Sequence, residues 1–275
     1  MDRERITGGG SSMGGTGTLE LIVRHPGLFG WVVMGVPAVN LPALPNARRL
    51  SAIIWGPMDK PVRCAEGGTV WQALNSHTYL QTHQVALPMM FINHGRKDTW
   101  MRWKHNPGFY RLLQRQGQPF VAYWDNGPHS TGARTKRVLP ALRKIVRPAR
   151  SEAFLSFANG SANDEPGNGD VTDGDLVGAI NLYYVSAEAR ETARRFRAEY
   201  GHDRDGATDG GTTDLIPQRL KAFPHKPGTV AAYRILDRGR QVKRGTVTAD
   251  RHGRYRIRSA PADRRYTLEL TPAGR

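Results

Sequence analysis

The sequence predicts an α/β fold: a parallel sheet covered by helices in the first half of the chain, followed by an antiparallel, sandwich-like β part. Two observations carry this prediction. Short apolar runs alternate with helical patterns up to about residue 148, and evenly spaced strand patterns fill the C-terminal third. A Gly-, Asn- and Asp-rich stretch separates them. We therefore divide the chain into a first region (1–148), a connection (149–178) and a β module (179–275).

The composition is that of a globular protein. The chain has 275 residues, of which 39% are apolar, enough to bury one or two ordinary cores. No apolar run reaches the length of a membrane span, and the charged N-terminus lacks the apolar stretch of a signal peptide. The single cysteine, Cys64, excludes an intrachain disulfide and leaves the compartment open. We expect no membrane-spanning segment.

The net charge of +16 would attract phosphate groups if it were gathered on one surface. The densest basic stretch, residues 134–150, instead alternates its charges with apolar residues at near-helical spacing. That pattern is typical of a helix with a solvated face. We therefore expect no nucleic-acid partner.

Continuous apolar runs in the first region predict parallel strands that are buried on both faces. These runs are 30–36, 88–92 and 119–124. Helical patterns between them would form the crossovers that parallel strands require, over 16–25, 70–81 and 108–116. From its position alone, the 41–85 insertion is predicted to form a small lid.

Strand patterns in the C-terminal third start about twelve residues apart, a spacing typical of an antiparallel sandwich or barrel. Turn residues such as Asp237-Arg238-Gly239 separate them. The predicted strands are 229–236, 241–248, 254–259 and 265–270, with 181–185 and 217–223 as further candidates. This part offers no nucleophile, metal cluster or aromatic platform, so we expect either a cap on the first region or a binding module.

The chain carries a G-x-S-x-G motif near its start, with Ser12 between Gly10 and Gly14. Such glycines allow a sharp strand-to-helix turn that exposes the serine hydroxyl, where flanking side chains would clash. The following helix directs its N-terminal amides at developing negative charge. We expect Ser12 to be a nucleophile and the amide of Met13 to be one donor of an oxyanion hole.

A serine nucleophile needs a base and an acid within reach through the fold. Asp98 follows the 88–92 run, and His129 follows the 119–124 run. The order Ser, Asp, His, each after a predicted strand, is that of nucleophile-elbow hydrolases. Asp125 is an alternative acid, but within the same short loop it is poorly placed to reach the far nitrogen of His129, so we favour Asp98.

Two other features leave alternatives open. Four aromatic residues near the predicted site could line a substrate pocket or belong to the core: Trp100, Trp103, Phe109 and Trp124. Residues 163–175 concentrate oxygen ligands among glycines, as calcium sites do, but lack the EF-hand spacing, so a solvated loop is the alternative.

Several segments together resemble the C-terminal half of an α/β-hydrolase of the esterase and prolyl-oligopeptidase-like group. They are Asp2–Thr7, similar to the strand before that group's nucleophile; Gly10–Gly15, similar to its G-x-S-M-G-G elbow; and His94–Asp98 and Gly127–His129, similar to its acid and histidine loops. The resemblance covers about residues 1–130.

The resemblance implies a partial α/β-hydrolase sheet, from the nucleophile strand onward, and cleavage of ester or peptide bonds. It assigns Ser12 as nucleophile, His129 as base and then acid, and Asp98 as the orienting carboxylate, with no cofactor or metal. The C-terminal part resembles immunoglobulin-like modules of secreted hydrolases, which favours an extracellular or periplasmic location.

The chain departs from this group at its start, because only eleven residues precede Ser12. We expect the loop that supplies the second oxyanion-hole amide to be missing, at a cost of about 3 kcal/mol in the barrier. The strand predicted over Glu4–Thr7 should then be an exposed edge. This predicts a fragment, a misplaced start codon or a degenerate gene, and the alternative function is a non-catalytic scaffold that binds through its β module.

Overall fold

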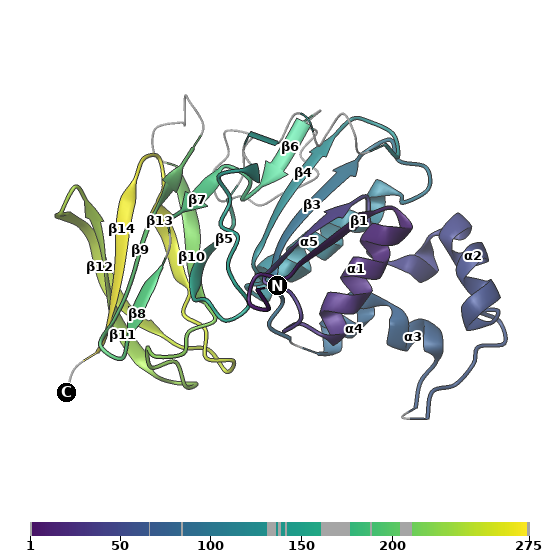
Figure 1. Ribbon diagram of the computed structural model, residues 1–275, viewed down its shortest axis with the longest axis horizontal. Helices are drawn as coiled ribbons and strands as arrows, with labels where there is room; N and C mark the ends of the chain where they lie inside the picture. Colours follow the sequence, from purple (N-terminus) through teal and green to yellow (C-terminus); the bar gives the residue numbers. More distant parts are fainter. Residues whose placement is uncertain are drawn as a thin grey trace.

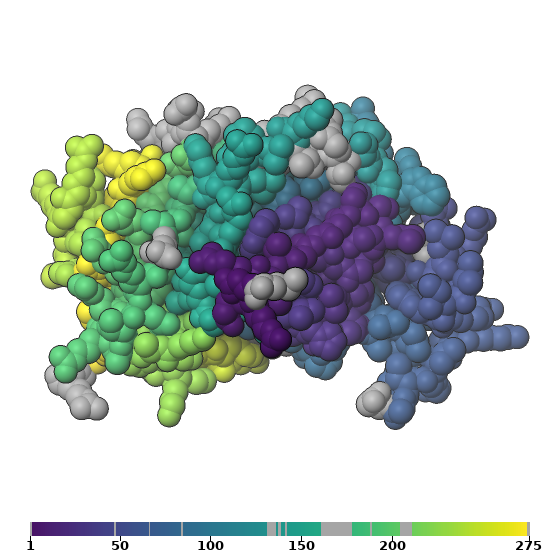
Figure 2. Space-filling model, viewed as in Figure 1, coloured from purple at the N-terminus to yellow at the C-terminus, as the bar shows by residue number. Residues whose placement is uncertain are grey.

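The computed structural model describes residues 2–65, 67–83, 85–130, 142–160, 177–187, 189–203 and 211–273, together with Lys136, Leu139 and Pro140. It has two parts that lie against one another: a mixed α/β part and a β part (Figure 1). In the space-filling view the two parts form one continuous body (Figure 2).

The α/β part is built on a five-stranded sheet in the order β1-β2-β3-β4-β6. The first four strands are parallel, and β6 is antiparallel to β4. The strands are β1 (Thr7–Ser11), β2 (Trp31–Gly35), β3 (Met89–Gly95), β4 (Phe120–Asp125) and β6 (Val177–Ile180). The three predicted apolar runs are β2, β3 and β4, and within the described residues β1 pairs with β2 alone, as an edge strand.

Both faces of this sheet are covered, which explains why its strands are continuously apolar. In β3, Met90 and Ile92 belong to one buried cluster with α1 and α5, whereas Met89 and Phe91 belong to another on the opposite face. The helices of this part are α1 (Met13–Arg24), α2 (Pro45–Trp55), α3 (Val70–Leu74), α4 (Ser76–Thr82) and α5 (Asn106–Arg115), with 3-10 turns at Leu41–Ala43 and Trp103–His105.

The 41–85 insertion differs from the prediction in its helices. The predicted helix over 70–81 is two helices, α3 and α4, separated at Asn75, whose side chain donates to Asn40 and Thr78. The helix α2 was not predicted. It lies at the far end of the molecule from the β part (Figure 1).

The insertion packs against the loop that follows β3. Its Trp71 is buried, contacts Trp55 edge to face at 5.0 Å between ring centroids, and shares a cluster with Leu41 and Leu44. Met101, from the loop after β3, belongs to the same cluster. The insertion therefore braces the loop that carries Asp98, and its role as a lid stays a prediction.

The β part consists of two antiparallel sheets around one apolar core. One has the order β12-β11-β14-β9-β7, with β8 paired to β9, and the other has the order β13-β10-β5. Its strands are β5 (Phe154–Ala158), β7 (Tyr184–Ser186), β8 (Arg190–Thr192), β9 (Arg195–His202), β10 (Thr212–Gln218), β11 (Val230–Asp237), β12 (Arg240–Thr248), β13 (Ile257–Pro261) and β14 (Tyr266–Pro272). The four strands predicted over 229–270 are β11 to β14, shifted by a few residues at some ends.

Two strands cross the boundaries drawn from the sequence. The predicted connection contains β5, and β6, at its end, returns to the first sheet. Alternate side chains of β5 join the two parts: Phe154 packs on the first sheet, while Leu155 and Phe157 enter the core of the β part. The strand is apolar on both faces because each face meets a different core.

Some sequence predictions fall outside the described residues. The calcium candidate at 163–175 does so entirely, and the basic stretch at 134–150 does so in part. In the rest of the chain, no cluster of three or more His, Cys, Asp or Glu could hold a metal ion. None of the helices in the described ranges is long and apolar enough to cross a membrane.

We expect Asn181→Gly to lower the free energy of unfolding by about 3 kcal/mol, because Asn181 holds the two parts together through three buried hydrogen bonds of about 1 kcal/mol each. Its amide donates to the carbonyls of Phe120 and Phe157 and accepts from the Gly160 N–H. Asn181 is fully buried at a φ of 58°, which glycine also adopts. Urea unfolding measures the loss.

Asn159→Gly is the matched control. Asn159 has nearly the same φ, 57°, but among the described residues its side chain makes one hydrogen bond, to Asp214. We expect it to cost about 1 kcal/mol. Equal losses in the two variants would contradict the role assigned to Asn181.

Candidate active site

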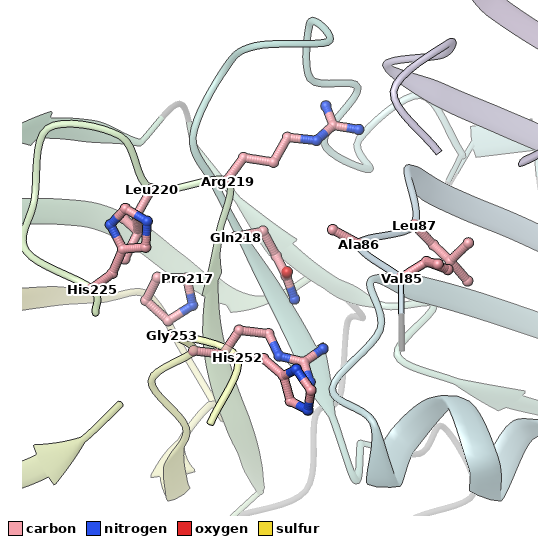
Figure 3. Close-up of a pocket in the computed structure, with 11 residues that line it drawn as sticks. Val85, Ala86, Leu87, Pro217, Gln218, Arg219, Leu220, His225, His252 and Gly253 are labelled. Carbon is pink, nitrogen blue, oxygen red and sulfur yellow. The ribbon is translucent and has the colours of Figure 1, made fainter. Parts of the chain in front are cut away.

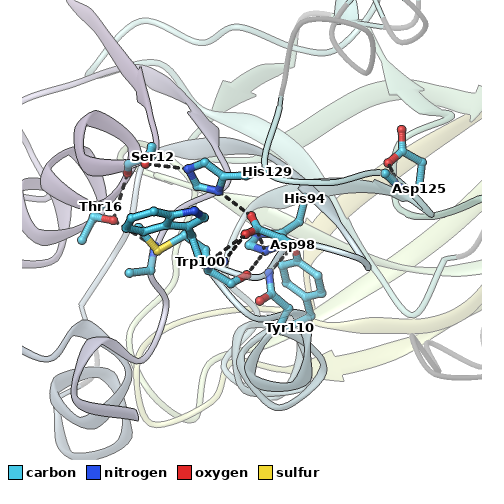
Figure 4. A network of polar contacts seen from close by, with 12 residues as sticks. Ser12, Thr16, His94, Asp98, Trp100, Tyr110, Asp125 and His129 are labelled. Carbon is cyan, nitrogen blue, oxygen red and sulfur yellow. Dashed lines mark hydrogen bonds and ion pairs between the residues drawn. The ribbon is translucent and has the colours of Figure 1, made fainter. Parts of the chain in front are cut away.

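Three polar side chains meet at the carboxyl edge of the parallel strands (Figure 4). Ser12 follows β1, Asp98 lies three residues after β3, and His129 lies four residues after β4. Nε2 of His129 lies 2.8 Å from Oγ of Ser12, and its Nδ1 lies 2.7 Å from Oδ2 of Asp98. The structure thus brings together the three residues that the sequence singled out.

The turn at Ser12 has the strain expected of a strand-to-helix elbow. Its φ of 56° lies in the left-handed region, which costs a non-glycine residue about 1–3 kcal/mol. Backbone hydrogen bonds hold it there: its N–H donates to Gly35, and its carbonyl accepts from both the N–H and the hydroxyl of Thr16. The constraint directs Oγ toward His129 (Figure 4).

The glycines around Ser12 are not equivalent, which corrects the prediction that both flanking glycines avoid a clash. A Cβ on Gly10 would lie 2.4 Å from the backbone of Gly14, and one on Gly15 would lie 2.6 Å from the carbonyl oxygen of Gly35. A Cβ on Gly14 would meet nothing within 4 Å. The close approach of α1 to β1 and β2 therefore requires Gly10 and Gly15, whereas the space at Gly14 is open.

The Asp98 carboxylate is buried and fully engaged. Its Oδ1 accepts the N–H groups of Trp100 and Met101, both at 2.8 Å, and its Oδ2 faces His129. Because a carboxylate only accepts hydrogen bonds, Nδ1 of His129 carries the proton in this pair. In the neutral ring, Nε2 is then the acceptor for the Ser12 hydroxyl, which is the arrangement that a general base requires.

Neighbouring polar residues support this site without entering it. His94 is fully buried, hydrogen-bonds the Met101 carbonyl through Nε2, and lies 3.6 Å from Asp98. Asp125, the alternative acid, accepts the Gly127 N–H at 2.9 Å and lies well away from His129 (Figure 4). The carboxylate that contacts His129 is therefore Asp98.

The four aromatic residues weighed as pocket or core separate by burial. Phe109 and Trp124 are buried in the core of the sheet, and Trp103 makes tilted ring contacts with both Trp124 and His94. Trp100 is 49% exposed, with its ring centroid 6.5 Å from that of His129. Of the four, only Trp100 stands beside the site as an exposed apolar surface.

The first turn of α1 lies directly after Ser12. Met13 is the first residue of α1, so its N–H is among the amides that have no partner within the helix. Met13 is 74% exposed, so the residue next to Ser12 presents an apolar side chain to solvent. An anion beside Ser12 Oγ would meet the positive end of the helix dipole.

The model of the prolyl oligopeptidase family matches residues 1–146, more than half of the chain. The chain belongs to the prolyl oligopeptidase family. This membership confirms the α/β-hydrolase resemblance of the first region. A search of curated proteins gives no match.

Solved structures similar to this family member include peptidases and esterases. A protein assigned as a dipeptidyl aminopeptidase IV of Bacteroides ovatus is 18% identical over 50% of this chain and 18% of its own, with a TM-score of 0.39. An acylaminoacyl peptidase of Pyrococcus horikoshii is 17% identical over 54% of this chain and 25% of its own, with a TM-score of 0.42. An esterase of Pyrococcus furiosus is 19% identical over 50% of this chain and 48% of its own, with a TM-score of 0.32. The chain thus spans a quarter or less of the two peptidases.

Proposed function

We propose that this protein is a serine hydrolase that cleaves an ester or peptide bond through an acyl-enzyme, with Ser12 as nucleophile, His129 as general base and then acid, and Asp98 as the orienting carboxylate. The observation that supports this best is the continuous hydrogen-bonded series from Ser12 Oγ through His129 to Asp98, at 2.8 and 2.7 Å. The tautomer set by Asp98 leaves Nε2 of His129 ready to accept the serine proton.

The proposed reaction has two halves. As Ser12 Oγ bonds to the substrate carbonyl carbon, its proton moves to Nε2 of His129, and Asp98 stabilises the imidazolium that forms. The imidazolium then protonates the leaving alcohol or amine, which departs and leaves an acyl-Ser12 ester. Water adds to this ester, with His129 taking its proton, and the acid is released as the proton returns to Ser12.

We propose the Met13 amide as one donor to the oxyanion of each tetrahedral intermediate, since it stands at the start of α1 directly after Ser12. For the substrate we propose a small ester or peptide. The exposed apolar surfaces of Met13 and Trp100 beside Ser12 and His129 suit an apolar group next to the scissile bond.

A fluorophosphonate probe, which labels activated serines, tests the proposal on the purified full chain. We expect Ser12→Ala to abolish labelling, because the nucleophile is removed, while Ser11→Ala, at the neighbouring position, remains labelled. Intact-protein mass spectrometry measures the adduct. A wild-type chain that takes up no probe, or a Ser12→Ala variant labelled as strongly as wild type, would overturn the proposed nucleophile in favour of a non-catalytic scaffold.

A further inference from the structure

A cavity lies at the seam between the α/β part and the β part (Figure 3), and none of the candidate active-site residues lines it. It measures about 320 Å³ and is lined by three segments of the chain: residues 85–87 before β3, the end of β10 with the residues that follow it (217–220 and His225), and the 252–254 turn after β12. This volume is that of a small-ligand pocket.

The walls of the cavity differ in character. One is apolar, with Val85, Ala86 and Leu87, and Leu220 contributes further apolar surface. The backbone of residues 85–87 is fixed by Gln118, whose side-chain amide donates to the Val85 carbonyl at 2.7 Å and accepts the Leu87 N–H at 3.2 Å. The opposite wall is basic and carries His252 and Arg254.

The charge of Arg254 is only partly compensated. Its side chain is 16% exposed, and its Nε lies 3.5 Å from Oδ2 of Asp250, a long ion pair with a half-exposed carboxylate. The other oxygen of Asp250 is taken by two backbone N–H groups, those of His252 and Arg254. In the described part of the chain, the terminal Nη groups of Arg254 make no hydrogen bond.

The surroundings of Arg254 also affect the free energy of its positive charge. Burial has the largest effect on the Arg254 guanidinium and lowers its pKa, Asp250 comes next and raises the pKa, and the nearby Arg256 lowers it by a smaller amount. Arg256 itself is satisfied by Asp214 and the Gln114 carbonyl. Burying a cation without a full partner costs free energy that an anionic ligand would recover.

The other polar groups are consistent with an acceptor ligand. His252 accepts a hydrogen bond from Arg251 at Nε2, so in the neutral ring its Nδ1 carries the proton and is a donor. The turn that holds His252 and Arg254 is fixed by Gly253, at a φ of 74° and with no room for a Cβ beside the His225 carbonyl. The donors are thus presented from a rigid turn.

We propose that this cavity binds a small monocarboxylate, with its carboxylate on the Nη groups of Arg254 and its hydrocarbon chain against Val85, Leu87 and Leu220. A carboxylate matches the planar fork of a guanidinium, and its single negative charge would complete the compensation of Arg254 that Asp250 provides only in part. Because its walls come from both parts of the protein, an occupied cavity would stabilise their association.

Isothermal titration of the full chain with octanoate tests the proposal, with octanamide as the uncharged analogue and acetate as the analogue without a chain. We expect octanoate to bind at one site and both analogues to bind at least tenfold more weakly, since one loses the charge pair and the other the apolar contact. Equal affinity for octanamide, or no binding of octanoate at millimolar concentration, would overturn the proposal.

Variants locate the binding site. Arg254→Gln should weaken octanoate binding at least tenfold, whereas Arg258→Gln, at an exposed arginine of β13 outside the cavity, should leave it within twofold. Ala86→Trp, at an exposed position of the apolar wall, should block binding without touching the arginine, and it decides the matter if Arg254→Gln fails to fold. Octanoate affinity unchanged in Ala86→Trp and in a folded Arg254→Gln would place its binding elsewhere.

Discussion

Asp98→Asn is expected to lower kcat by about four orders of magnitude, or about 5.5 kcal/mol in the barrier. The asparagine oxygen can keep the two hydrogen bonds from Trp100 and Met101, so the loop after β3 should stay in place. Its NH2 group then faces Nδ1 of His129 and donates to it. The ring is held in the opposite tautomer, with the proton on Nε2, and no longer accepts the Ser12 proton.

Hydrolysis of a p-nitrophenyl ester by the two proteins measures this loss. Asp125→Asn is the matched control: it makes the same change in a buried carboxylate at the end of β4, whose Oδ1 accepts the Gly127 N–H, as an asparagine oxygen also can. We expect the control to stay within threefold of wild type. A larger loss of activity in Asp125→Asn than in Asp98→Asn would show that Asp125, and not Asp98, orients His129.

The strands that could be predicted from the sequence are those whose burial follows from the apolar pattern of their own residues. The strands β2, β3 and β4 are buried on both faces and are therefore continuously apolar. The strand β9 was missed although Phe196, Ala198 and Tyr200 alternate with charged residues, a period of two that would have identified it. The apolar run of β5 was also missed, because the prediction included it in the Gly- and Asn-rich connection over 149–178.

Other features depend on partners that are distant in sequence. Asn181 is an ordinary polar residue in the sequence, and only the meeting of Phe120, Phe157 and Gly160 around it makes it a link between the two parts. The cavity at the seam likewise assembles from separate segments, one of which, residues 85–87, lies more than a hundred residues from the other two. No local pattern predicts such convergence.

The candidate site could be predicted because its geometry follows from topology. Parallel strands end at the same edge of a sheet, so residues that follow β1, β3 and β4 must gather there. The choice of Asp98 over Asp125 also followed from loop length. What the motif did not predict is which glycine the elbow requires, since G-x-S-x-G treats Gly10 and Gly14 alike.

The difference between Gly10 and Gly14 leads to the second substitution with a large expected effect on activity. We expect Gly10→Ala to lower kcat/KM by at least about 100-fold and the free energy of unfolding by about 2 kcal/mol. The new methyl group would lie 2.4 to 2.8 Å from three backbone atoms of Gly14, so α1 must move away from β1. Since Ser12 lies at the turn between them, Oγ would leave the position 2.8 Å from His129. Ester hydrolysis and urea unfolding measure the two losses.

Gly14→Ala is the control, because it adds the same methyl group on the other side of Ser12, where nothing lies within 4 Å. Alanine is also a better helix former than glycine by up to about 1 kcal/mol, so α1 should be as stable as in wild type or more so. We expect activity within a few-fold of wild type. If both variants lost activity equally, the strained turn would depend on glycine flexibility rather than on the close approach of α1 to β1.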